Sequence, residues 1–276
     1  NLTISPSEDL AGLAARALPP VGKDAAPPLF AAYERATRVN WRNNWNLVGS
    51  GFWLRGGHPL DQHDHCDRGH LNFIAGGKPI LIEAGTPHYS HPLMGSHFAS
   101  GVGHDVLQIG TLEAASANAG ETVQLKGWQQ MGVVAPITVK TLDLEGGKAS
   151  VTVSTGYDGL KRWVREASWG AVHVSVQDSV ELLEGRSEVI MFRWHLGTDE
   201  DVVIEQDDET CKVSWSDAEI MFESPAAYTV TQVKLPDNTI NTVSDNWQAD
   251  PRHTCLVVQT TNASQAFSIL TEVSAR

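Results

Sequence analysis

Ala171-Val172-His173-Val174-Ser175-Val176 is a run in which apolar and polar side chains alternate. Successive side chains of a β-strand point to opposite faces, so a two-residue period is typical of a strand with one buried face. Turn residues follow such runs, as at Pro236-Asp237-Asn238. Many short strands and no long helical pattern after residue 38 predict an all-β fold, an antiparallel multi-stranded β-sandwich. Further runs of this kind lie at 150–154, 188–194, 202–205, 211–215, 219–222, 228–233, 254–260 and 267–273.

The first 38 residues have a different pattern. Helical periodicity begins after Ser7 and ends at Pro19-Pro20, and a second short helical stretch is expected around Phe30–Arg35. We therefore expect a partly helical N-terminal arm or linker at 1–38 and a β-sandwich domain at 39–276. Because the chain begins without methionine, we expect a processed mature chain or a fragment of a longer one.

Composition excludes several classes of protein. The 276 residues are 41% hydrophobic and 19% charged, which is ordinary for a globular protein. No run of about 18 apolar residues is present, so a membrane span is not expected. The net charge of −13 argues against nucleic acid or anionic lipid as a partner. Cys66, Cys211 and Cys255 show no C-x-x-C spacing, and the last two could pair only if their strands are neighbours.

Histidine is concentrated in one part of the chain. Eight of the 11 histidines lie between His58 and His104, most densely at His63-Asp64-His65-Cys66-Asp67. On a strand, His63 and His65 would share one face and could converge on one ion or substrate. The alternative is a set of scattered surface and turn histidines.

A hairpin follows this cluster. Leu71–Ala75 has the pattern of a strand, Gly76-Gly77 that of a turn, and the returning strand would bring Glu83 back beside His65. Imidazole and carboxylate groups suit zinc or another divalent transition metal. His104 is the best placed candidate for a third ligand.

As an ordered set, these motifs resemble the C-terminal β-sandwich domain of the heparinase II/III-like polysaccharide lyases. The matching pieces are Trp53-Leu54-Arg55-Gly56-Gly57, His63-Asp64-His65-Cys66-Asp67, the segment 77–85, Tyr89, and His104-Asp105-Val106-Leu107. The family usually has asparagine where this chain has Asp105, and aspartate where it has Glu83.

The resemblance implies a metal, usually zinc, bound by His65, Glu83 and His104. It implies that His63 faces the substrate as a catalytic residue. It also implies that Asp67 orients one of the metal-binding imidazoles without itself binding the metal. The implied reaction is β-elimination on a uronic-acid glycan in a cleft between the sandwich and a helical (α/α) toroid. The implied location is periplasmic or secreted, in a bacterium.

Four residues near the cluster are candidates for contact with an acidic polysaccharide or oligosaccharide. Arg42 and Arg55 would supply local positive charge, Trp53 a flat apolar ring, and Tyr89 a hydroxyl group. In the family, the proton-transferring Tyr and His lie mostly in the helical domain, which would be this domain's partner. We therefore expect this chain alone to bind metal but to cleave little or no glycan.

Two other functions fit part of the pattern. A cupin-like metalloenzyme would use His63, His65, His70 and His104, although the usual glutamate after its H-x-H is missing. A non-catalytic glycan-binding sandwich with a structural metal is the second alternative. The strand-borne Trp163, Trp169, Trp194 and Trp215 are expected in the core under every interpretation.

Overall fold

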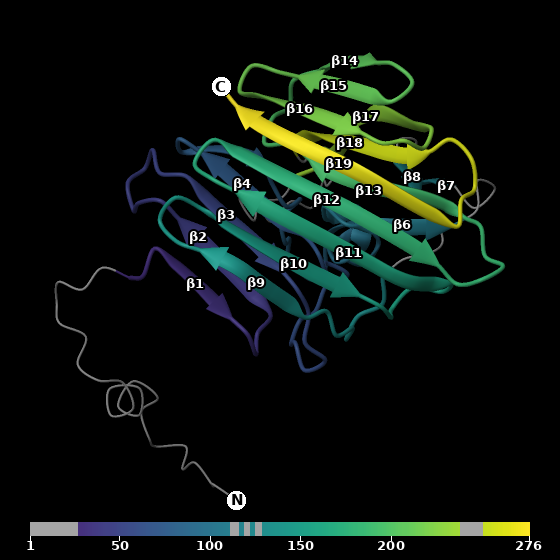
Figure 1. Cartoon of the computed structure of the whole chain (residues 1–276), viewed down its shortest axis with the longest axis horizontal. Helices are drawn as coiled ribbons and strands as arrows, with labels where there is room; N and C mark the ends of the chain where they lie inside the picture. Colours follow the sequence, from purple (N-terminus) through teal and green to yellow (C-terminus); the bar gives the residue numbers. More distant parts are fainter. Residues whose placement is uncertain (1–26, 111–115, 119–121, 125–128, 238–250) are drawn as a thin grey trace, which may run out of the picture.

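The computed structural model describes residues 27–110, 116–118, 122–124, 129–237 and 251–276, and these are nearly all in β-strands and loops (Figure 1). Every strand pair among them is antiparallel, which confirms the predicted fold class. Within these residues no helix is both long and apolar enough to cross a membrane.

The largest sheet has eight strands in the order β14-β15-β16-β19-β12-β11-β10-β9. Its long central strands bury every second side chain, as the alternation predicted. Its strands are Val203–Gln206 (β14), Thr210–Ser214 (β15), Ala218–Glu223 (β16), Ala266–Ala275 (β19), His173–Leu182 (β12), Leu160–Trp169 (β11), Gly147–Val153 (β10) and Ile137–Leu142 (β9).

Two smaller sheets, of five and four strands, form the second layer. The first has the order β1-β2-β3-β4-β5: Phe30–Tyr33, Arg38–Arg42, Gly51–Arg55, Leu71–Ala75 and Lys78–Leu81. The second has the order β17-β18-β13-β6: Tyr228–Pro236, Arg252–Thr260, Val189–His195 and Leu107–Gly110. Two short helical turns, η1 (Met94–Phe98) and η2 (Gly101–Gly103), precede β6, and the hairpin Ser116–Asn118 (β7) and Thr122–Gln124 (β8) follows it.

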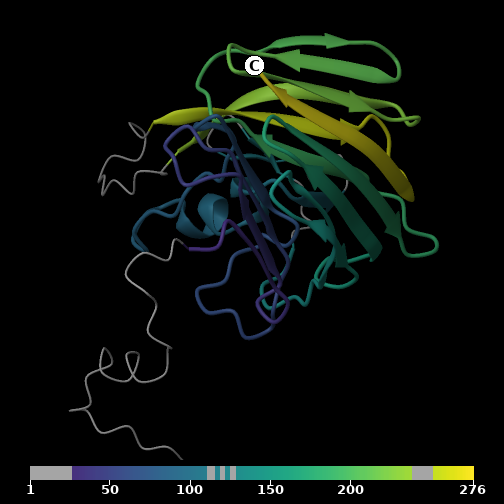
Figure 2. The ribbon, with the colours of Figure 1, turned by 60° about the vertical axis from the view of Figure 1, so that its left-hand side comes forward.

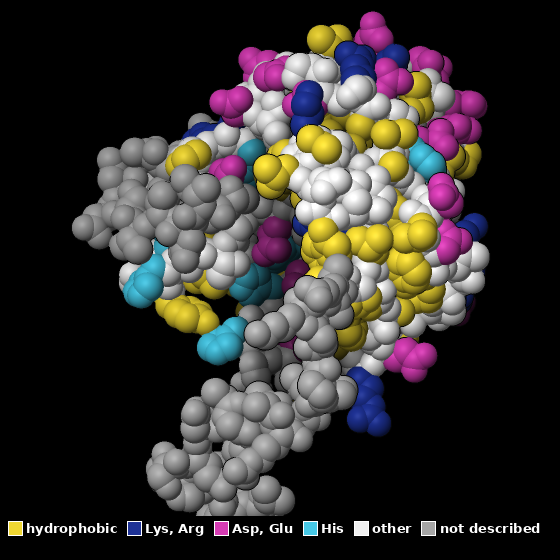
Figure 3. Space-filling view, turned by 90° about the vertical axis from the view of Figure 1, so that its left-hand side faces the viewer, with side chains coloured by type: hydrophobic (Ala, Val, Ile, Leu, Met, Phe, Trp, Pro, Cys, Tyr) yellow, Lys and Arg dark blue, Asp and Glu magenta, His cyan; other side chains and the backbone are white. Residues whose placement is uncertain are grey.

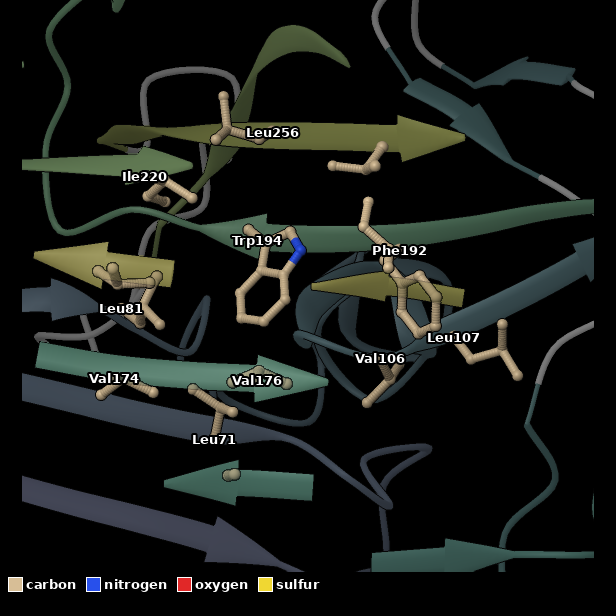
Figure 4. Close-up of a cluster of buried hydrophobic side chains, with 14 of the residues drawn as sticks. Leu71, Leu81, Val106, Leu107, Val174, Val176, Phe192, Trp194, Ile220 and Leu256 are labelled. Carbon is tan, nitrogen blue, oxygen red and sulfur yellow. The ribbon is translucent and has the colours of Figure 1, made fainter. Parts of the chain in front are cut away.

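Aromatic contacts show that both small sheets pack on the eight-stranded sheet. Phe52 of β3 stacks on Trp169 of β11 with ring centroids 4.1 Å apart. From the four-stranded sheet, Phe192 of β13 meets Trp163 at 5.8 Å. Figure 2 shows the five-stranded sheet beside the teal strands of the large one, and Figure 4 shows Phe192 and Trp194 among aliphatic side chains of all three sheets. The expected core tryptophans, Trp163, Trp169, Trp194 and Trp215, are all buried.

The two small sheets meet along a seam. Leu81 at the end of β5 forms an antiparallel bridge with Leu196, just after β13. The amide of Ile82 donates to the carbonyl of His195 at 3.0 Å, and the amide of Gly197 donates to the carbonyl of Ile80 at 3.1 Å. Residues that follow β5 therefore lie beside the four-stranded sheet, which positions the candidate site.

Two local expectations differ from the structure. The short helix expected around Phe30–Arg35 is wrong: residues 30–33 are β1, paired with β2, because Phe30 packs against the core and the free edge of β2 accepts a strand. Cys211 and Cys255 lie on strands of different sheets, and all three cysteines are free and buried. The helical pattern expected between residues 7 and 19 falls outside the described residues.

Candidate metal centre and adjoining pocket

His65, Glu83 and His104 come together at the seam between the two small sheets. Nδ1 of His65 lies 4.0 Å from Oε1 of Glu83, and Nδ1 of His104 lies 3.8 Å from the same oxygen. One ligand atom from each of the three residues lies within 4.8 Å of the others. This spacing would allow a single ion to contact all three.

The hairpin and the seam position two of these side chains. Gly76 and Gly77 adopt positive φ angles of 57° and 83°, as the tight turn between β4 and β5 requires. Glu83 follows β5 by two residues, and the next amide, of Ala84, donates to the carbonyl of Gly103 at 3.2 Å. Glu83 is thereby held beside His104.

The third side chain, that of His65, lies on a loop. Residues 56–70 contain no strand, so the expectation that His63 and His65 share one face of a strand is wrong. The physical reason is Arg68, whose guanidinium is fully buried beneath this loop. Arg68 pairs with both oxygens of Asp64 at 2.5 and 2.8 Å and donates to the carbonyls of His65 and Val133 at 2.8 and 3.0 Å. The loop therefore wraps a cation instead of pairing with a strand.

Burial favours the neutral form of the two imidazoles, the form in which they bind metal. Burial, and then the neighbouring histidines, lower the pKa of His104 well below its usual value, and burial also lowers the pKa of His65. His104 is fully buried, and neither of its ring nitrogens has a hydrogen-bond partner among the described residues. An orphaned buried nitrogen is costly, and coordination would satisfy it.

Glu83 complements these imidazoles. Burial, followed by the charge of Asp67, raises the pKa of Glu83 to about 7. A carboxylate in this environment gains from a nearby cation, because the cation stabilises its charged form. Two neutral imidazoles and one carboxylate are a donor set that suits zinc. The residues present therefore fit a divalent metal.

His63 lies beside the triad but faces a pocket. Its ring Nδ1 hydrogen-bonds to the hydroxyl of Tyr89, a side chain that is 68% exposed. Its backbone has a φ of 51°, in the left-handed region that costs a non-glycine residue about 1–2 kcal/mol. Strain of this kind is concentrated at functional positions, because only a site that needs the orientation retains it.

The pocket has a volume of about 380 Å³ and opens over the outer face of the five-stranded sheet. Figure 3 shows histidine and acidic side chains gathered in a hollow of the molecule. Of the residues expected in the site, the pocket brings together Trp53, Arg55, His63, His65, Asp67, Glu83 and Tyr89. His104 lies behind this wall, fully buried.

Arg55 is surrounded by carboxylates. Its Nη2 lies 3.1 Å from Asp61 and 3.2 Å from Asp64, and its Nε contacts Asp67. These contacts neutralise much of its charge within the protein. Asp67 also meets Arg68 at 3.2 Å, and the ion pairs of Asp67 among the described residues join it to arginines rather than to a ligand imidazole.

Arg42 lies at the margin of the pocket. Its guanidinium is 5.1 Å from the ring centroid of Trp45 and 5.4 Å from that of Trp53. Trp41, one residue earlier, is fully buried and belongs to the core. The pocket also has polar wall residues that sequence reasoning missed: Arg38, Asn40 and Asn72. For Arg38 and Asn40 the signal is the alternation of β2, which points 38, 40 and 42 away from the core, and for Asn72 it is the alternation of β4.

Asp105 lies at a position where the family that the sequence resembles usually has asparagine. It is fully buried, and its Oδ1 accepts a 2.6 Å hydrogen bond from the amide of His195. Burial raises the pKa of Asp105 well above its usual value. A neutral carboxylic acid has nearly the shape of an amide, which explains how aspartate fits where asparagine is usual.

Two known structures share the fold of this chain. A heparinase III superposes over 92% of this chain with a TM-score of 0.66 at 11% identity. The heparan sulfate lyase HepC from Pedobacter heparinus superposes over 92% with a TM-score of 0.62 at 14% identity. The chain spans only 38% and 37% of the length of those two proteins. No curated protein matches it significantly.

These structural similarities show the fold, and a family model shows to which family the chain belongs. The model described as "Heparinase II/III-like, C-terminal" matches residues 54–272, a span that holds the triad, the loop 56–70, the whole four-stranded sheet and nearly all of the eight-stranded sheet. Of the five-stranded sheet it holds β4, β5 and the end of β3. The cupin alternative is therefore set aside, and the chain belongs to the heparinase II/III-like C-terminal family.

Proposed function

We propose that this chain is the metal-binding domain of a polysaccharide lyase that cleaves uronic-acid glycans by β-elimination. The observation that carries the proposal is the His65–Glu83–His104 triad directly beside a pocket that His63 and Tyr89 line. The named relatives, a heparinase III and a heparan sulfate lyase, point to the same class of substrate. A periplasmic or secreted location would suit such a substrate.

In β-elimination a base removes the proton on C5 of the uronate, the C4–C5 double bond forms, and the C4–O4 bond breaks as an acid protonates the departing oxygen. We assign His63 to proton transfer at this site, with Tyr89 holding its Nδ1 by a hydrogen bond. The metal, for which zinc is the best fit, would supply positive charge beside the pocket. His65, Glu83 and His104 would hold it there.

The whole protein would complete the site. Because the relatives are more than twice as long as this chain, we propose that a helical domain contributes further proton-transferring groups. The test compares residues 1–276 with the full gene product, each incubated with heparan sulfate and with an unsulfated polyuronate. We expect unsaturated, ultraviolet-absorbing products from the full protein and little or none from residues 1–276.

The same assay on His63→Ala in the full protein tests the role of His63. We expect activity to be lost while zinc stays bound, because His63 lies outside the triad. A full protein that binds metal and glycan but releases no unsaturated product would instead identify a non-catalytic glycan-binding module. Steady product release by residues 1–276 alone would contradict the need for a second domain.

A further inference from the structure

The outer face of β2 carries a row of polar side chains that the triad does not use. Residues 38, 40 and 42 are Arg, Asn and Arg, and the strand alternation points them away from the core. Arg38 and Asn40 line the pocket, and Arg42 lies beside its Trp53 wall. At about 3.4 Å per residue, the two arginine positions are roughly 14 Å apart along the strand.

These arginines differ from the others near the pocket. Arg55 and Arg68 are both held by Asp64 and Asp67. Within the part of the chain that the structure describes, neither Arg38 nor Arg42 makes an ion pair or a side-chain hydrogen bond. With no partner among the described residues, their N–H groups can bind an anion, which guanidinium groups do with paired hydrogen bonds.

Arg42 is held in place by aromatic rings. It lies over both Trp45 and Trp53, and the Nε1–H of Trp45 donates to the carbonyl of Pro27 at 2.9 Å. Gly51 of β3 lies opposite Arg42 and has no side chain, which leaves space for the ring of Trp53. A Cβ atom on residue 51 would lie 2.9 Å from the Trp53 ring. Trp45 is still 50% exposed and offers a flat surface for a sugar ring.

We propose that Arg38, Asn40, Arg42 and Trp45 form a glycan-binding track that extends from the pocket along β2. Arg42 and Arg38 each bind an anionic group of a sugar, a carboxylate or a sulfate, while Asn40 meets hydroxyl groups between them and Trp45 stacks on a ring. The length of the row means that the two arginines contact different sugars of one chain. This proposal takes one assumption from the proposed function, namely that the ligand is an acidic glycan.

The experiment measures binding of three hexasaccharides to residues 1–276 by calorimetry: one from heparan sulfate, an unsulfated hexauronate and neutral cellohexaose. We expect Arg42→Gln and Arg38→Gln each to weaken binding of an acidic hexasaccharide by about tenfold or more, since each loses charged hydrogen bonds. Trp45→Ala should weaken it several-fold. Arg162→Gln, an exposed arginine on the eight-stranded sheet, is the matched control and should bind like the wild type.

The two acidic probes separate the two anions. Binding of both probes identifies the carboxylate as the recognised group, and binding of the sulfated probe alone identifies the sulfate. Equal binding by Arg42→Gln, Arg38→Gln and Arg162→Gln overturns the track, as does equally tight binding of cellohexaose. The proposed function fails separately, if the full gene product yields no unsaturated sugar although the arginine variants still lose binding.

Discussion

Oε1 of Glu83 lies 3.8 Å from Nδ1 of His104, and this contact joins the residue that follows β5 to the segment that leads into β6. The two residues lie in loops that adjoin different sheets, Glu83 after β5 and His104 before β6, so the candidate ligand set closes only when the sheets dock. A metal there would stabilise the docked arrangement, because it binds the folded protein and not the separated sheets. Metal binding at this site and the docking of the two small sheets would therefore be coupled.

Removal of any one triad residue should remove the metal. We expect His65→Ala, Glu83→Gln and His104→Ala each to lower zinc affinity by more than about 100-fold, since loss of an outer-sphere partner alone costs 10–100-fold. Equilibrium dialysis followed by metal analysis measures this. His63→Ala is the control, because its Nδ1 bonds to Tyr89 and it lies outside the triad. Loss of zinc from His63→Ala equal to that from His65→Ala would contradict the assignment.

Zinc affinity should also depend on pH through Glu83. Its pKa of about 7 means that below pH 7 a proton must leave before the carboxylate can bind zinc. Burial lowers the pKa of both imidazoles, so they compete with protons at a lower pH than an ordinary histidine does. Affinity should therefore fall about tenfold for each pH unit below 7, by one proton. Calorimetric titration at several pH values measures this slope.

The control for this pH dependence is Glu83→Gln. Its residual zinc binding should be nearly independent of pH between about pH 6 and pH 8, because the competing proton is gone. A wild-type affinity that stays flat across the same range would show that Glu83 is not a ligand.

Short sequence patterns correctly predicted those parts of the fold and site that depend on contacts within a few residues. The Gly76-Gly77 turn between two apolar runs was enough to place Glu83 beside His65. Of the run at 171–176, residues 173–176 begin a confirmed strand, β12, and the two before them belong to the preceding turn. Both depend on periodicity and turn chemistry within a few residues, which a sequence displays directly.

Long-range contacts decide the rest, and no local pattern shows them. The loop that carries His65 is shaped by Arg68, whose partner Val133 lies 65 residues away. The strand at 30–33 forms because β2 offers an edge and the core accepts Phe30, which outweighs a weak helical pattern. Arg38 was missed for a related reason, since only the tertiary structure shows that carboxylates neutralise the charge of Arg55 and that no described residue forms an ion pair with Arg38.

Arg68→Met should destabilise the protein and loosen the metal site together. The change takes from the carboxylate of Asp64 its bidentate partner, and a buried charge left wholly unpaired costs about 3–5 kcal/mol. Because Arg55 stays 3.2 Å from Asp64, we expect a loss of stability below that range. Urea unfolding measures the loss, and zinc affinity should fall with it. Arg186→Met, at an exposed pair with Asp158, is the control and should change little.

A double variant separates the charge from the packing. Arg68→Met combined with Asp64→Leu should recover part of the lost stability, because the carboxylate that lost its bidentate partner is then absent. A single Arg68→Met variant as stable as the wild type would show that the guanidinium does not hold the loop.

Asp105→Asn should leave the metal-free protein equally stable or more stable, and increasingly so as the pH rises. Burial raises the pKa of Asp105 in the folded state, so between its unfolded and folded pKa values the folded protein holds the extra proton. Stability from this group is complete below about pH 4 and falls as the pH rises. The amide keeps an oxygen for the amide of His195 and carries no titrating proton.

Urea unfolding with a chelator present, at several pH values from about 5 to 9, measures the difference between variant and wild type. Asp178→Asn is the matched control with the opposite sign. Asp178 is equally buried, but Arg165 pairs with both of its oxygens at 2.9 Å. Loss of the Asp178 charge would leave the buried guanidinium of Arg165 without an opposite charge. We expect Asp178→Asn to lower stability at every pH in this range. If Asp105→Asn destabilises the protein as much as Asp178→Asn does, Asp105 is an ionised partner in the fold and not a neutral substitute for asparagine.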